Sequence, residues 1–148
     1  MILTVAQLRL CFDGPRLNEL SSRYDDSVGS IVYDETIIST CIAQADSLIK
    51  GNLVKGYTVA QIEADASLQR LCANITLYFL ELGKGSLPDT VKTNYLEALE
   101  RLARIRSGDE ILAAVTQQLP TATNITPLTE EVSEDEYFSD LISDSEVL

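Results

Sequence analysis

The stretch that decides the fold is residues 34–53, which read DETIISTCIAQADSLIKGNL. Its apolar side chains recur at intervals of three and four residues, the spacing that places them on one face of an α-helix. They are Ile38, Cys41, Ile42, Ala45, Leu48 and Ile49. Asp34 is a good N-cap, because its carboxylate can accept a hydrogen bond from a free N–H of the first turn. Gly51 interrupts the pattern and indicates a bend or a close backbone contact.

Two further long helices are predicted downstream, from about Asp65 to Leu82 and from about Pro88 to Ser107. Their apolar stripes are Leu68, Leu71, Cys72, Ile75, Phe79 and Leu82 in the first, and Val91, Tyr95, Ala98, Leu99, Leu102 and Ile105 in the second. Leu77, Tyr78 and Leu80 broaden the first stripe until little polar surface remains. A helix that is apolar nearly all round is buried on several sides, in a core or at an interface.

Short elements are predicted before and between the long helices. Thr4 and Gln7 have the spacing of a capping box, and Thr58 and Gln61 have it again. Gly14-Pro15 should end a first helix over residues 3–11 and start a second short one. We therefore predict an all-α fold: a small helical bundle of three main helices plus short N-terminal helices.

Residues 21–33 are predicted to form a polar loop. Gly29 followed six residues later by Glu35 has a faint similarity to a calcium-binding loop. Tyr24 and Val28 then occupy positions that should donate oxygen ligands, which argues against bound calcium.

Acidic side chains are concentrated near the C-terminus. Residues 1–108 carry 13 acidic and 11 basic side chains, whereas residues 109–148 carry ten acidic and no basic ones. We divide the chain accordingly into a helical domain, residues 1–108, and an acidic C-terminal tail, residues 109–148. Asp109–Leu119 could add one short helix. The remainder cannot bury enough apolar surface alone to offset its ordering entropy, so we expect it to become ordered only on partners.

The tail contains four candidate partner-binding residues. Tyr137, Phe138, Leu141 and Ile142 are spaced to share one face of a short amphipathic helix. Such side chains could anchor the tail in a partner's groove, or the segment could add a strand to the edge of a partner's sheet.

No catalytic constellation is recognisable in the sequence. The chain has no histidine, the side chain that titrates near neutrality and is the commonest metal ligand. The three cysteines include no Cys-x-x-Cys pair, and each lies in an apolar helical pattern, so we expect buried free thiols. The paired carboxylates sit in polar stretches that would not separate their pKa values. We expect a protein that is not an enzyme and needs no cofactor or metal.

The apolar runs are too short for a membrane helix, which requires about 20 residues, so we also expect a soluble protein without a membrane partner.

Six segments follow one another in a recognisable order. They are LTVAQL (3–8), LNEL (17–20), DETII (34–38), AQADSLIKGNL (43–53), RLCANI (70–75) and YLEALERL (95–102). In this order the chain resembles the Mu-like prophage family of small helical proteins, related to the head–tail connector (adaptor) proteins of tailed bacteriophages. The resemblance covers about residues 1–108.

The resemblance implies a homo-oligomeric ring of twelve copies in the neck of the virion, assembled in the bacterial host cytoplasm. The ring would dock on the portal protein, lengthen the DNA channel and present a surface to a tail-side stopper or neck protein. DNA would pass through the ring without specific binding.

Two surfaces of the helical domain are candidate partner sites. Leu77, Tyr78 and Leu80 could face a neighbouring subunit. Arg101 and Arg104 could form a partner patch, or they could be cations placed near a helix C-terminus and paired with Glu97 and Glu100 one turn earlier. An alternative function is an acidic inhibitor or DNA mimic acting on a host nucleic-acid enzyme, although the nearly neutral helical domain disfavours it.

Overall fold

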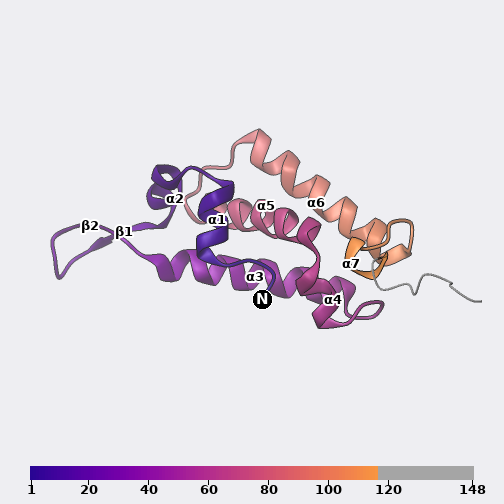
Figure 1. Ribbon diagram of the computed structural model, residues 1–148. Helices are drawn as coiled ribbons and strands as arrows, with labels where there is room; N and C mark the ends of the chain where they lie inside the picture. The colour runs from indigo at the N-terminus through magenta and orange to yellow at the C-terminus, as the bar shows by residue number, and fades with distance from the viewer. Residues whose placement is uncertain (117–148) are drawn as a thin grey trace, which may run out of the picture.

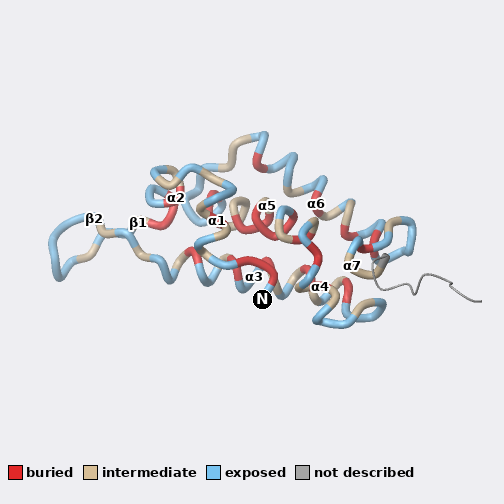
Figure 2. Tube along the Cα trace, in the orientation of Figure 1, coloured by how far each residue is buried: buried red, intermediate tan, exposed pale blue. Residues whose placement is uncertain are grey.

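Three long helices form the centre of the molecule. In the computed structural model, which describes residues 1–116, these are α3 (Glu35–Leu53), α5 (Ala66–Gly83) and α6 (Asp89–Ser107). Helix α5 packs against both α3 and α6, and α3 also contacts α6 (Figure 1). The all-α prediction is confirmed. The apolar stripes face one another, as the buried segments in Figure 2 show, and their fully buried members include Ile38, Ile42, Ile49, Leu68, Ile75 and Leu102.

The long helices begin and end where local chemistry favours it. The Asp34 carboxylate accepts from the Thr36 N–H at 3.0 Å and caps α3. Gly108 ends α6 with a φ of +89°, a left-handed conformation that costs glycine little. Gly51 was predicted to mark a bend or a close backbone contact; within residues 1–116 a Cβ at this position would meet nothing within 4 Å, and α3 continues through it to Leu53.

Three short helices complete the N-terminal half and the connection between α3 and α5. They are α1 (Val5–Cys11), α2 (Gly14–Ser21) and α4 (Val59–Ala64). Both predicted capping boxes are present, at Thr4 with Gln7 and at Thr58 with Gln61. The sequence pattern therefore predicted these helix starts correctly.

The segment predicted as a loop is a β-hairpin. Strand β1 (Ser22–Asp25) pairs antiparallel with β2 (Ser30–Tyr33), with Tyr24 opposite Ile31. The turn is closed by the Asp25 carboxylate, which accepts from the Ser27 N–H at 2.9 Å, and by Gly29 at a φ of +67°. Figure 1 shows the hairpin extending away from the helices at one end of the molecule.

The packed part of the chain continues beyond Gly108. Leu112 is buried in the core, and α7 (Ala113–Thr116) contacts α4. The helical unit thus extends at least eight residues past the boundary drawn at residue 108. The first part of the segment assigned to the tail belongs structurally with the helices.

Candidate functional site

The apolar side chains in the C-terminal half of α5 are less uniformly buried than the sequence predicts. Leu77 and Tyr78 are half-buried, whereas Leu80 is only 2% exposed and belongs to the core. Leu80 is therefore not available as a surface contact. Leu82, which we assigned to the buried stripe, is 54% exposed, because it lies on the last turn of α5 and faces away from α3 and α6.

An aromatic cluster joins α5 to α6. The rings of Tyr78 and Tyr95 are stacked, with centroids 3.8 Å apart and planes 8° from parallel. Phe79 approaches both, at 5.9 Å from Tyr78 and 6.3 Å from Tyr95. Burial raises the pKa of Tyr95, with a smaller contribution from Tyr78. Tyr78 is thus used within the subunit, and only its outer edge can serve a partner.

The predicted arginine patch is partly neutralised inside the molecule. Arg101 Nε donates to Glu110 Oε1 at 2.7 Å, and Arg101 Nη2 forms an ion pair with the same oxygen at 2.6 Å. Arg104 Nε lies 3.8 Å from the other oxygen of Glu110. Within the described residues, the pairs predicted with Glu97 and Glu100 are replaced by this one, because the chain turns back after Gly108 and brings Glu110 onto the face of α6.

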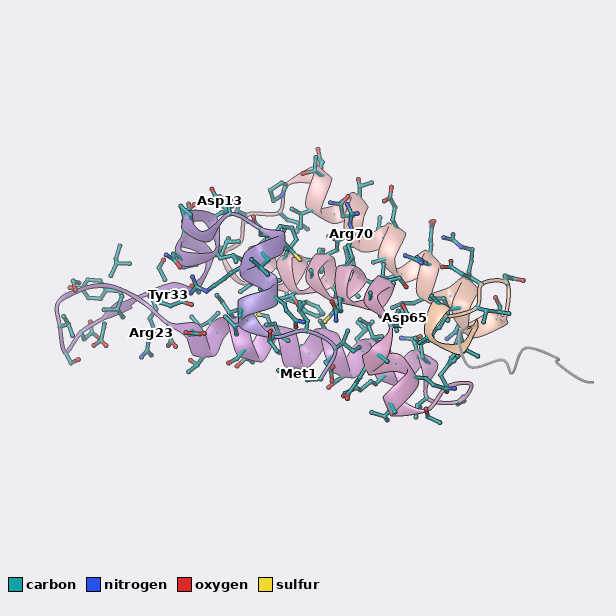
Figure 3. All side chains as sticks on the ribbon, viewed as in Figure 1. Met1, Asp13, Arg23, Tyr33, Asp65 and Arg70 are labelled. Atoms are coloured by element: carbon teal, nitrogen blue, oxygen red, sulfur yellow. The ribbon has the colours of Figure 1, made fainter. Side chains whose placement is uncertain are left out.

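Asp65 fastens the same returning segment from the other side. Its Oδ1 accepts from the Ser67 N–H at 2.9 Å and caps α5, while its Oδ2 accepts from the Ala114 N–H at 3.1 Å at the start of α7. Asp65 is 1% exposed and lies where α4, α5 and α7 meet (Figure 3). Burial opposes its ionisation, but the hydrogen bonds from Ser67 and Ala114 outweigh burial and lower the pKa. Sequence reasoning missed this contact because its partners are 49 residues apart.

A small groove lies beside α7, at the end of α3. It has a volume of about 390 Å³, and an apolar floor with exposed cations at its edge. The floor includes Leu53, Tyr57, Ile105, Ile111 and Val115, and the cations are Lys55 and Arg106. We refer to it as the α7 groove.

Among the described residues, the side-chain contacts that fix the hairpin to the body lie at its base. Arg23 pairs with Asp34 at 2.9 Å, and Arg9 donates to the Tyr33 hydroxyl while its guanidinium stacks 5.2 Å from the Tyr33 ring (Figure 3). Beyond that base, Tyr24, Val28 and Ile31 are all exposed. The sequence contained a signal for this element, namely two short β-prone runs separated by a glycine-containing turn.

A known protein family matches most of this chain, including the segment that folds back after Gly108. The family model described as Bacteriophage Mu, Gp36 matches residues 3–129. The chain belongs to this family. The match runs past Gly108, in agreement with the docked position of residues 109–116. None of the curated proteins matches this Gp36-family chain.

Metal-ligating side chains and thiols are the remaining candidate reactive groups in residues 1–116 of the Gp36-family chain. Within residues 1–116, no three His, Cys, Asp or Glu side chains are grouped so as to hold a metal ion. Burial raises the pKa of Cys72 to about 12 and also raises that of Cys41. Cys11 is exposed, so the prediction of a buried thiol is wrong there, because its side chain points away from the packed face of α1.

The four tail residues predicted to bind a partner, Tyr137, Phe138, Leu141 and Ile142, lie outside the described residues. Among the helices of residues 1–116, none has the length and apolar character needed to span a membrane.

Proposed function

We propose that this Gp36-family protein is a structural component of the phage particle, a head–tail connector (adaptor) subunit. In this proposal, copies of the chain assemble into a ring of twelve on the portal protein. The ring extends the DNA channel toward the tail and receives a stopper or neck protein on its other side. The observation that carries the proposal is the family match over residues 3–129.

The surface of the described residues supports a role in assembly. A ring subunit must leave apolar surface for its two neighbours, and exposed apolar side chains occur at both ends of α3: Ile31 in the hairpin and Ile111 beside α7. The interior is occupied by packed aliphatic side chains, and the chain has no histidine to activate a nucleophile. These features favour a scaffold over an enzyme.

The charge of the chain suits a channel through which DNA moves. Its formal net charge is −12 at pH 7. Tight binding to DNA requires cations that neutralise phosphates and release counterions. Residues 1–108 carry nearly equal numbers of acidic and basic side chains, and residues 109–148 carry the rest of the negative charge, so a ring of this chain would exert little net attraction on DNA.

The test uses the full chain with the portal protein of the same phage. Native mass spectrometry and negative-stain electron microscopy of the mixture should reveal closed rings seated on the portal. A chain that stays strictly monomeric and does not bind the portal would overturn the proposal. Tight, salt-sensitive binding to a host nucleic-acid enzyme instead would support the inhibitor alternative.

A further inference from the structure

The hairpin presents an apolar face that nothing in residues 1–116 covers. Tyr24 and Ile31 are opposite each other in the register, so both side chains lie on one face of the ribbon, and both are exposed. Val28 in the turn is 64% exposed. An isolated two-stranded hairpin is marginally stable in water, and uncovered apolar patches mark interaction sites. These features indicate that the hairpin is a site at which a partner binds.

The tip of the hairpin also carries negative charge. Asp25 ends β1, and Asp26 lies in the turn with Val28 and is exposed. Hydrogen bonds from Ser27 lower the pKa of Asp25 and keep its carboxylate ionised. A matching surface must therefore combine an apolar floor with cations near its edge.

The α7 groove has that combination. Ile111 is 63% exposed at its mouth, and Tyr57 and Val115 lie half-buried within it. Lys55 and Arg106 are exposed at its edge, and within residues 1–116 the Arg106 side chain makes one long hydrogen bond, of 3.4 Å, to Asn52. Both surfaces thus have exposed apolar residues, and the negative charge of the hairpin is opposite in sign to the charge at the edge of the groove.

A hairpin cannot reach the groove of its own chain. The hairpin joins the first residue of α3, and the groove lies at its last residue, Leu53. A helix of 19 residues is about 28 Å long at 1.5 Å per residue. Figure 1 shows the hairpin and α7, beside which the groove lies, at opposite ends of the molecule. A hairpin that fills the groove must therefore come from another copy.

We propose that the hairpin of one copy docks into the α7 groove of the next copy, with Val28 entering the apolar floor and Asp26 facing Lys55 and Arg106. Different surfaces of the two copies meet in this contact, so each copy keeps one free hairpin and one free groove. Such a head-to-tail interface closes into a ring when the rotation between copies permits it. The inference rests on the proposed connector function and names the contact that would join its subunits.

The decisive experiment compares two single variants of the full chain. Val28→Asp places a charge on the hairpin and Ile111→Asp places one in the groove, both at exposed positions where the fold should tolerate it. Each variant should lose self-association at least tenfold by sedimentation and should form no rings with the portal. Leu10→Asp adds the same charge at another exposed apolar position, on α1, and should assemble like the unmodified chain.

Mixing the two variants tests the direction of the contact. The Ile111→Asp copy keeps an intact hairpin, and the Val28→Asp copy keeps an intact groove. An equimolar mixture should therefore form a one-to-one dimer that grows no further, detected by native mass spectrometry. An interface of identical patches would leave this mixture unassembled.

Charge exchange provides a second test of the register. Asp26→Lys should weaken assembly, and combining it with Lys55→Asp should recover part of the loss, more strongly at low salt because exposed charges are screened. No recovery would contradict the proposed facing of Asp26 and Lys55.

The outcomes separate this inference from the function on which it rests. Rings on the portal with the Val28→Asp chain would disprove the hairpin contact and leave the connector function standing. Loss of assembly with Ile111→Asp but not with Val28→Asp would mean that something else fills the groove, such as residues 117–148, and would overturn the inference. Failure of the unmodified chain to form rings or bind the portal would overturn both.

Discussion

Lys50 pairs with two acidic side chains, one of which also pairs with the N-terminal amino group. Its Nζ lies 2.8 Å from Asp46 Oδ2 and 2.6 Å from Glu63 Oε1, and the amino group of Met1 also pairs with Glu63. The hydrogen bond from Lys50, followed by that from the amino group, lowers the pKa of Glu63 from 4.5 to about 2. A carboxyl group with a lowered pKa in the folded state stabilises that state wherever the unfolded chain would also be ionised.

The stabilisation by Glu63 should therefore disappear in acid. It should be complete above about pH 4.5 and decline as the pH falls toward 2, through the interval between the two pKa values. Thermal unfolding of the unmodified chain and of Glu63→Gln, followed from pH 7 to pH 2, should give melting temperatures that differ at neutrality and converge in acid. A difference that stayed constant over this range would contradict the ionic role of Glu63.

Asp65 should contribute more than an ordinary helix cap. Asp65→Ala removes the cap of α5, worth about 1 kcal/mol, and also leaves the Ala114 N–H without its acceptor, so we expect about 2 kcal/mol or more of lost stability in urea unfolding. Asp65→Ser is the matched control, because its short side chain can cap α5 but cannot reach Ala114. Amide exchange at Ala114 should accelerate in both variants; unchanged exchange would mean that the contact does not hold α7.

Contacts between residues close in the sequence could be predicted, whereas contacts between distant residues could not. The caps at Thr4, Asp34 and Thr58 follow from neighbours two or three residues away, and all three were predicted. Glu110 and Asp65 find their partners only after the chain folds back. The local pattern favoured Glu97 for Arg101, since one helical turn separates them, and the tertiary contact with Glu110 prevailed.

At the scale of elements, stacking between Tyr78 and Tyr95 should couple α5 to α6. Stacked aromatic pairs are worth about 0.5–1.5 kcal/mol beyond the area they bury. A double-mutant cycle with Tyr78→Ala and Tyr95→Ala should return a coupling energy of that size in denaturant unfolding. Tyr95→Phe keeps the ring and should keep the coupling, whereas a coupling near zero would show that the two rings act independently.

The elements differ in how well their patterns predicted them. The three long helices were found because each repeats apolar residues over many turns. The hairpin was assigned to a loop because its strands are only four residues each, too short for period-two alternation to stand out from a polar stretch. Leu80 and Leu82 show the same limit within one helix, since a segment that is apolar all round does not reveal which side faces the core.

At the scale of the whole molecule, the position of α7 determines where the acidic remainder of the chain begins. Asp65, Glu110 and the buried Leu112 hold residues 109–116 against the helices. The later residues, 117–148, contain eight acidic and no basic side chains. The apolar residues Tyr137, Phe138, Leu141 and Ile142 belong to this strongly acidic segment, which follows the last residue of α7 in the sequence.

Deleting residues 120–148 should separate folding from assembly. The cut leaves α7 and its contacts with Asp65 intact, so circular dichroism and the thermal midpoint should remain close to those of the full chain. Binding to the portal, measured by co-sedimentation, should weaken because we expect Tyr137, Phe138, Leu141 and Ile142 to bind a partner. A full-length control with Tyr137, Phe138, Leu141 and Ile142 replaced by serine keeps the charge and should show the same loss. If the truncated chain binds the portal as the full chain does, the segment acts only to keep the protein in solution, since charge alone then accounts for its presence.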